Sequence, residues 1–168
     1  EHCRGEGELL LDVRGLSAGY GPVDANGQPA VLILQDIDFK LYRGQAIGVI
    51  GESGSGKTTL ARAIAGLIKP CQGSMVFANA ELKPELRERS KEELRRIQIV
   101  FQMADTALNP SQTIERILAR PLQFYKGLKG AALQRRIHEL LDLVTLPHSV
   151  AGRLPGGLSG GQKQRVNL

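Results

Sequence analysis

The stretch GESGSGKTT, residues 51–59, has the residue types and the spacing of a loop that binds phosphate. Gly51, Gly56, Lys57 and Thr58 stand at the fixed positions of the pattern G-x-x-x-x-G-K-[ST]. In such a loop the backbone N–H groups point at phosphate oxygens, the lysine reaches the outer phosphates, and the hydroxyl can ligate Mg²⁺. The stretch predicts a nucleoside triphosphate site rather than an accidental glycine-rich turn. The residues expected to bind the nucleotide are Gly51, Glu52, Ser53, Gly54, Ser55, Gly56, Lys57, Thr58 and Thr59.

A second glycine turn, LSGGQ at residues 158–162, stands just before KQRVNL, which can begin a helix. Ser159 can cap that helix, and Gly160 and Gly161 leave room for an anion to approach the backbone. The turn therefore has the parts of a second anion site. Taken alone, it is equally well explained as a helix-capping loop without a ligand.

Strands and one helix are expected to hold these two turns in place. The apolar run AIGVI at 46–50 predicts a strand buried on both faces, directly before the first glycine loop. Residues 57–68 have helical periodicity, so the loop joins a strand to a helix, which favours the phosphate-binding interpretation. Other strands are expected at 9–16, 31–44, 74–78 and 97–101, with a glycine- and proline-rich loop at 20–29.

The second part of the chain has a different pattern. The charged run at 81–96 predicts a solvated loop with a helical turn, whereas TIERILARPL (113–122) and GAALQRRIHELLDLVTL (130–146) predict amphipathic helices. His138 is expected on the surface of the second helix. No strand pattern follows residue 101, so an α-helical part follows a β-rich and then α/β part.

Composition narrows the class of protein without identifying it. The net charge of +5 suits an anionic ligand or an acidic surface, and an ordinary basic surface explains it equally well. Two cysteines without metal-ligand spacing fit a reducing cytosol. No apolar run approaches the roughly 18 residues that would span a bilayer, and the first residues do not have the pattern of a secretory signal.

Taken together, the two glycine turns resemble the nucleotide-binding domain of ATP-binding cassette (ABC) ATPases, whose signature motif is L-S-G-G-Q. This resemblance covers the chain from Leu9 to Leu168 and implies a head-to-tail pair of domains. Each ATP then lies between the phosphate loop (Walker A) of one domain and the signature motif of the other. The residues that would act in trans are Ser159, Gly160, Gly161 and Gln162.

The same resemblance gives roles to two further residues. Tyr20, in AGYG, stands where the family places an aromatic ring that stacks on adenine, although an ordinary loop tyrosine is the alternative. Gln102 matches the Q-loop glutamine, which approaches Mg²⁺ and the attacking water; a polar strand end is the alternative. The implied catalytic residues are Lys57 and Gln102, the implied metal ligands are Thr58 and Gln102, and the implied cofactors are ATP and Mg²⁺.

The resemblance also implies an α/β P-loop NTPase core with an N-terminal antiparallel β part and an α-helical subdomain, without the C-terminal strands. The expected divisions are a linker or tail of a preceding segment at 1–8, the nucleotide-binding core at 9–102, the helical subdomain at 103–157, and the signature motif with the start of a helix at 158–168. Cys3 would belong to the preceding segment; a start methionine just upstream would contradict this.

Around residues 101–110 the chain looks most like the ATPases of oligopeptide, dipeptide and nickel importers, which read F-Q-D-P-x-x-S-L-N-P there. Met103, Ala104 and Ala107 depart from that pattern, which weakens the inference about the substrate. The implied partners are a second ATPase domain and membrane permeases contacted through residues 103–125, at the cytoplasmic face of the membrane, with no nucleic acid. The alternatives are a soluble ABC ATPase acting on nucleic acid or ribosomes, and a non-hydrolysing ATP-binding regulatory module.

The family's Walker B aspartate and glutamate and its switch histidine would follow the signature motif, and we expect these 168 residues to stop before them. His2, His138 and His148 all precede that motif, so none of them matches the switch histidine. We therefore expect these 168 residues alone to bind ATP with little or no hydrolysis. We also expect an unpaired apolar strand edge at 46–50, and with it marginal stability or self-association.

Overall fold

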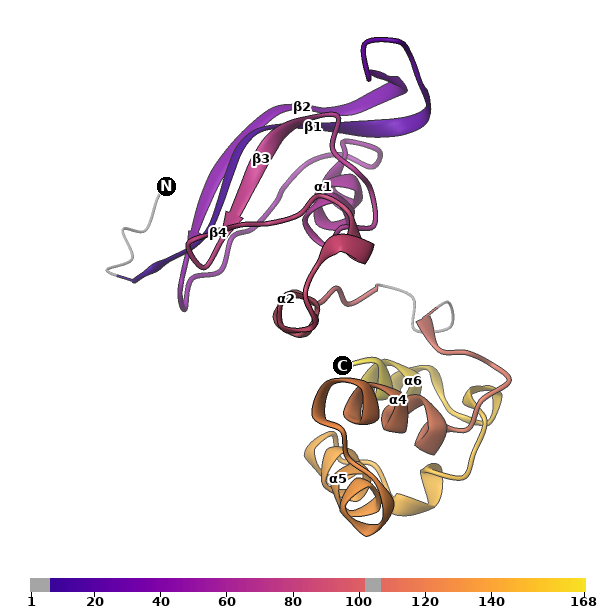
Figure 1. The fold of residues 1–168 in the computed structure, drawn as a ribbon. Helices are drawn as coiled ribbons and strands as arrows, with labels where there is room; N and C mark the ends of the chain where they lie inside the picture. Colours follow the sequence, from indigo (N-terminus) through magenta and orange to yellow (C-terminus); the bar gives the residue numbers. More distant parts are fainter. Residues whose placement is uncertain (1–6, 102–106) are drawn as a thin grey trace. The chain divides into compact units, whose positions relative to one another are not determined.

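The chain is described by a computed structural model over residues 7–101 and 107–168, and it divides into two compact units (Figure 1). The first unit is Glu1–Ile99 and the second is Val100–Leu168. Each unit has its own cluster of buried apolar side chains. Every helix of the described residues is too short or too polar to span a lipid bilayer.

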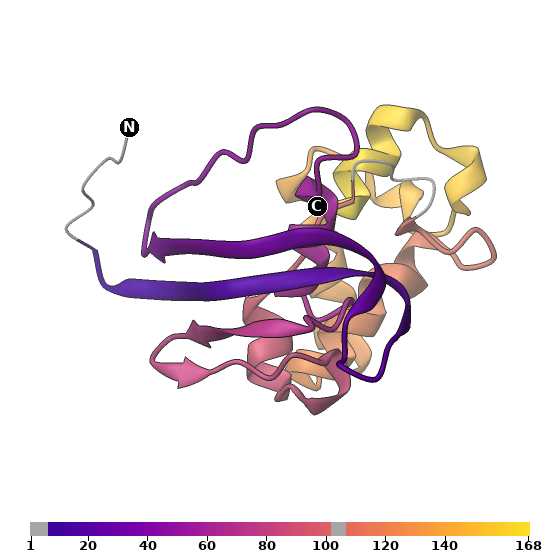
Figure 2. The same ribbon diagram turned by 90° about the horizontal axis from the view of Figure 1, so that it is seen from above.

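A four-stranded antiparallel sheet forms most of the first unit, in the order β2-β1-β3-β4 (Figure 2). In chain order the strands are β1 (Leu9–Val23), β2 (Pro29–Tyr42), β3 (Gln72–Phe77) and β4 (Ala80–Glu81). In the centre of the sheet Val13 lies opposite Phe39 on one side and Met75 on the other. This confirms the expected N-terminal antiparallel β part.

The hairpin between β1 and β2 is tighter than the sequence predicts. The loop expected at 20–29 is reduced to residues 24–28, because β1 continues to Val23. The Asp24 carboxylate accepts hydrogen bonds from the backbone N–H groups of Asn26 and Gln28, at 2.9 and 2.8 Å. Such side-chain bonds can form a turn from few residues, so the strands extend further than composition suggests. As a consequence Tyr20 lies in a strand.

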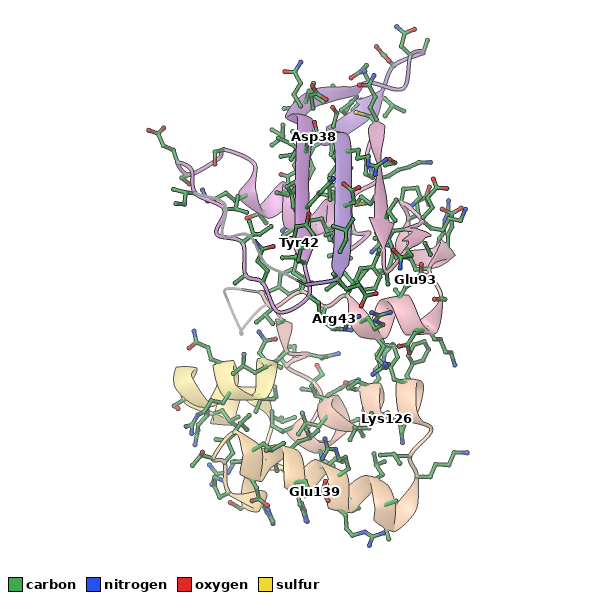
Figure 3. The ribbon with its side chains drawn as sticks, turned by 90° about the vertical axis from the view of Figure 1, so that its left-hand side faces the viewer. Asp38, Tyr42, Arg43, Glu93, Lys126 and Glu139 are labelled. Carbon is green, nitrogen blue, oxygen red and sulfur yellow. The ribbon has the colours of Figure 1, made fainter. Side chains whose placement is uncertain are left out.

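Further along the same pair of strands, a side chain reinforces the backbone ladder. Asp38 of β2, labelled in Figure 3, accepts a hydrogen bond of 2.8 Å from the backbone N–H of Gly15 on β1. The pair ends beyond Tyr42, where the Arg43 backbone N–H donates to the carbonyl of Glu8. The end predicted at Arg43–Gly44 is therefore confirmed.

One helix, α1 (Lys57–Ile64), packs against the sheet and completes the core of the first unit. Leu60 and Ala63 are its buried apolar contacts, 8% and 0% exposed. The helix is shorter than the predicted range of 57–68 because the chain turns at Gly66, where the N–H of Leu67 bonds back to the carbonyl of Arg62. The buried residues of this core are Leu11, Val13, Leu16, Ala18, Leu34, Leu60, Ala63, Met75 and Leu82.

Two predicted strands do not form. Residues 46–50 and 97–101 are irregular, and neither pairs with any strand of the described chain. Ile50 is 98% exposed, whereas the prediction placed it in a strand buried on both faces. An apolar run becomes a strand only where a neighbour satisfies its backbone N–H and C=O groups, and the four strands of this sheet come from other segments.

The charged run at 81–96 contains the short helices η1 (Leu86–Glu88) and α2 (Lys91–Arg96), in agreement with the predicted helical turn. Ser90 and Glu93, the latter labelled in Figure 3, form a capping box at the start of α2.

The second unit is helical, as predicted. The helices among its described residues are α4 (Ile114–Lys126), α5 (Gly130–Leu143) and α6 (Gly160–Asn167), with the short turns η2 (His148–Val150) and η3 (Pro155–Gly157). Leu133, Ile137 and Leu141 of α5 are buried, which confirms the predicted apolar stripe. His138 is partly exposed, and its ring stacks on that of His148 with 4.2 Å between ring centroids.

Candidate functional site

The glycine loop 51–56 has a backbone path that side chains would obstruct. Gly54 and Gly56 have φ angles of 84° and 95°, in the left-handed region that favours glycine. A Cβ at Gly56 would lie 2.9 Å from Leu34 Cδ2 and 3.0 Å from Ile33 Cγ2, so β2 closes one side of the loop. The fixed glycine of the motif is therefore favoured by its φ angle, and a Cβ there would also displace the side chains of Leu34 and Ile33.

The loop leads directly into the N-terminus of α1. Gly56 is the N-cap, no side chain among the described residues caps this end, and the first turn contains no acidic residue. The partial positive charge of the helix end is therefore left for an anionic ligand. Thr58, on the first turn, is exposed, as a hydroxyl that ligates a metal from solvent must be.

Lys57 folds over the loop from the first position of the helix. Its Nζ donates to the carbonyl oxygens of Gly51 and Glu52, both at 2.6 Å, and to Ser55 Oγ at 3.3 Å. The ammonium group is thus held against the loop by the loop's own acceptors. A phosphate in the loop would place its oxygens within reach of the same group.

Tyr20 reaches the phosphate loop from the neighbouring strand. Its hydroxyl lies 3.2 Å from Thr59 Oγ1, and Arg62 Nη1 donates to it at 3.4 Å. The Thr59 hydroxyl, and after it Arg62, lower the pKa of Tyr20 below its usual value of 10, against the effect of burial. The fold therefore brings together Tyr20 and the last residue of the predicted phosphate loop, which are far apart in the sequence.

Oxygen ligands suit Mg²⁺, which usually takes one or two protein groups together with phosphates and waters. Thr58 offers such an oxygen beside Lys57. Gln102, the other predicted metal and catalytic residue, lies outside the described residues. The described part of the chain contains no cluster of three or more His, Cys, Asp or Glu residues that could hold a metal ion.

The second glycine turn caps a helix, as predicted. Ser159 Oγ accepts from the backbone N–H of Gln162 at 3.3 Å, and Gln162 Oε1 accepts from the backbone N–H of Ser159 at 2.9 Å. Gly160 and Gly161 are exposed, and a Cβ on either would meet nothing within 4 Å. The backbone of the first turn of α6 is thus open to solvent.

Sequence reasoning missed two arginines that lie near these turns and hold neighbouring residues: Arg62, which donates to the Tyr20 hydroxyl, and Arg165. Arg62 follows Thr59 by three residues, so both lie on one face of α1. Arg165 donates from Nη1 to the carbonyls of Val144 and Thr145, at 3.4 and 3.0 Å, and thereby ties α6 to the end of α5. The only signal in the sequence was the helical spacing between a motif residue and an arginine. That spacing shows that the two residues share a helix face, but it does not show what the arginine contacts.

The sequence model of the ABC transporter family matches residues 34–168, which includes both glycine turns. The chain belongs to the ABC transporter family. The antiparallel sheet beside α1 and the separate helical unit agree with solved ABC ATPases. One is the dimeric ATP-binding cassette MJ0796 in a post-hydrolysis state bound to ADP and Pi, with a TM-score of 0.72 and 26% identity, covering 94% of this chain and 67% of that one.

Curated ABC relatives include ATP-binding proteins of importers. The nickel import ATP-binding protein NikE of Pseudomonas putida is 43% identical over 136 residues, covering 81% of this chain and 50% of that protein. The oligopeptide transport ATP-binding protein OppF of Haemophilus influenzae is 35% identical over 167 residues, which cover 96% of this chain and 50% of that protein. The chain therefore spans about half the length of these two relatives.

Proposed function

We propose that this chain is part of the ATP-binding subunit of an ABC transporter, whose intact ATPase domain couples ATP binding and hydrolysis to the import of a small solute. The observation that carries the proposal is the phosphate loop 51–59, with Lys57 over its carbonyls and the N-terminus of α1 at its end. The proposed nucleotide contacts are those expected from the sequence, from Gly51 to Thr59, with the Tyr20 ring stacked on adenine. Thr58 and Gln102 would hold Mg²⁺, which neutralises phosphate charge when bound.

Replacing Lys57 with alanine tests this assignment. Because Lys57 supplies the charged donor of the loop, we expect the variant to bind ATP about tenfold or more weakly in isothermal titration calorimetry. Lys126→Ala, at the end of α4 in the other unit (Figure 3), is the matched control for lost positive charge and should bind ATP as the wild type does. Equal ATP affinity in wild type and Lys57→Ala would refute the assignment.

The signature turn is proposed to bind the ATP held by a second domain. Ser159, Gly160, Gly161 and Gln162 would contribute the first-turn backbone of α6, which is open and carries no acidic residue. A head-to-tail pair would then enclose each ATP between two chains. The dimeric form of the MJ0796 relative supports this arrangement.

The solute is proposed to be of the peptide or nickel type, and the names of the NikE and OppF relatives support this class. The partners would be membrane permeases that contact residues 103–125, at the cytoplasmic face of the membrane. The same proposal divides the chain into a nucleotide-binding core that ends at residue 102, a helical subdomain at 103–157, and the signature motif from residue 158. Co-purification with two permeases would separate this function from a soluble ABC ATPase or a regulatory module.

We further propose that the 168-residue polypeptide binds ATP without hydrolysing it at a significant rate. The described residues of the phosphate loop and the signature turn supply donors that would stabilise phosphate charge, and this supports the binding part of the proposal. Phosphate release clearly above an enzyme-free blank would contradict this proposal.

A further inference from the structure

The hydroxyl of Tyr20 has two partners on the same helix. Thr59 Oγ1 lies 3.2 Å away and Arg62 Nη1 lies 3.4 Å away, and both residues belong to α1. Tyr20 itself is in β1, opposite Val31 of β2. The tip of the ring is therefore tied to a helix while its backbone is fixed in a sheet.

The ring remains accessible although its tip is held. Tyr20 is 40% exposed, so part of its surface is open to solvent. A ring fixed at both ends loses little rotational freedom when a planar group stacks on it, and an already ordered contact surface increases affinity. Stacking of a base on an aromatic side chain also depends on the orientation of the ring.

We propose that Arg62 is a positioning residue for the nucleotide base, which it orients by holding the Tyr20 hydroxyl. This inference rests on the proposed function, in which the Tyr20 ring stacks on adenine. Thr59 is the other anchor, but it is also the last residue of the phosphate-binding motif 51–59 proposed above, so its substitution would disturb phosphate binding as well. Arg62 lies one turn beyond the loop, and its only described side-chain hydrogen bond goes to Tyr20.

The arrangement predicts that Arg62 contributes to binding of the nucleotide base and not to binding of the phosphates. In the purified protein, Arg62→Ala should weaken ATP binding about threefold to tenfold, the range for one lost hydrogen bond, and Arg62→Lys should restore most of it. Binding of inorganic tripolyphosphate, which has no base, should change by less than about twofold. Arg135→Ala, an exposed arginine on α5 in the other unit, controls for lost positive charge.

A second readout follows the hydroxyl directly. The difference between the ultraviolet pH titrations of the wild type and Tyr20→Phe isolates the ionisation of Tyr20. Thr59 first and Arg62 after it lower the pKa of this group, so Arg62→Ala should raise it towards the usual value. A residue that supported only the fold of α1 would change the melting temperature without this selective shift. The double variant Tyr20→Phe/Arg62→Ala should also bind ATP no more weakly than the worse single variant.

The possible outcomes separate this inference from the proposed function. If Tyr20→Ala leaves ATP affinity unchanged, the ring does not stack on the base, and the proposed role of Tyr20 fails together with the inference. If Tyr20→Ala weakens ATP binding but Arg62→Ala does not, only the inference is overturned. Equal losses for ATP and tripolyphosphate in Arg62→Ala would also overturn it, because Arg62 would then act on the phosphates.

Discussion

At the scale of single residues, the site depends on two adjacent positions, Gly56 and Lys57, that have different roles. Gly56 combines a φ of 95° with close contacts to side chains of β2, and Lys57 begins the helix immediately after it. The first residue shapes the loop and the second supplies its charge. Neither can take over the role of the other, which is why the spacing of the motif is fixed.

Gly56→Ala should therefore damage both stability and binding. A non-glycine residue in this conformation costs about 1–3 kcal/mol, and Leu34 and Ile33 would have to move as well. We expect the first unit to melt at a lower temperature and ATP to bind more weakly. In Gly152→Ala, where a Cβ meets nothing within 4 Å, stability should change by less than about 0.5 kcal/mol. Unchanged melting and ATP affinity in Gly56→Ala would contradict the described loop.

At the scale of elements, helices were predicted better than strands, and the reason is physical. A helix such as α5 satisfies its own backbone, so the spacing of Leu133, Ile137 and Leu141 is enough to predict it. A strand needs a neighbour that its own residues do not specify, so the apolar run at 46–50 gave a wrong prediction. Likewise the motif spacing identified the phosphate loop, whereas the contact of Tyr20 with Thr59 and Arg62 depends on how β1 lies against α1.

The capping box of α6 allows the structural and the ligand-binding roles of Ser159 to be separated. Ser159→Ala removes the cap and should destabilise the second unit by about 1 kcal/mol, measured by chemical denaturation. Ser159→Asp should retain the cap and the stability, since aspartate caps as well as serine does. Its negative charge should nevertheless oppose the phosphate of the partner's ATP and so weaken ATP-dependent dimerisation, which sedimentation velocity would measure.

Two results would contradict this assignment of Ser159. One is a Ser159→Ala variant as stable as the control Ser149→Ala, which changes an exposed serine in the neighbouring turn η2. The other is ATP-dependent dimerisation of Ser159→Asp equal to that of the wild type. Such a result would mean that the phosphates of the partner's ATP do not lie at the N-terminus of α6.

At the scale of the whole molecule, the chain has two separate cores and exposed apolar residues outside them. The first unit is built around the sheet and α1, and the second around α4, α5 and α6. Ile50 and Val49 belong to neither core and are 98% and 53% exposed. Adjacent exposed apolar residues on an unpaired segment are a typical site of association between chains.

Ile50→Lys should reduce self-association of the 168-residue chain. The side chain is almost fully exposed, so the charge should leave the stability of the first unit unchanged while it opposes contact between copies. The weight-average mass from light scattering, without nucleotide, should fall towards that of the monomer. Leu143→Lys, at a 72% exposed position of α5, should have a smaller effect. The same mass in Ile50→Lys and wild type would exclude residue 50 from the contact.

The bonds that Lys57 makes within its own loop also determine how ATP binding should be interpreted. The ammonium group already has the carbonyls of Gly51 and Glu52 as partners, so phosphate binding is an exchange of acceptors and not a gain of new ones. The affinity lost in Lys57→Ala therefore measures the difference between two sets of hydrogen bonds. The released carbonyls need new partners, such as solvent, so part of the enthalpy of ATP binding should come from the loop itself.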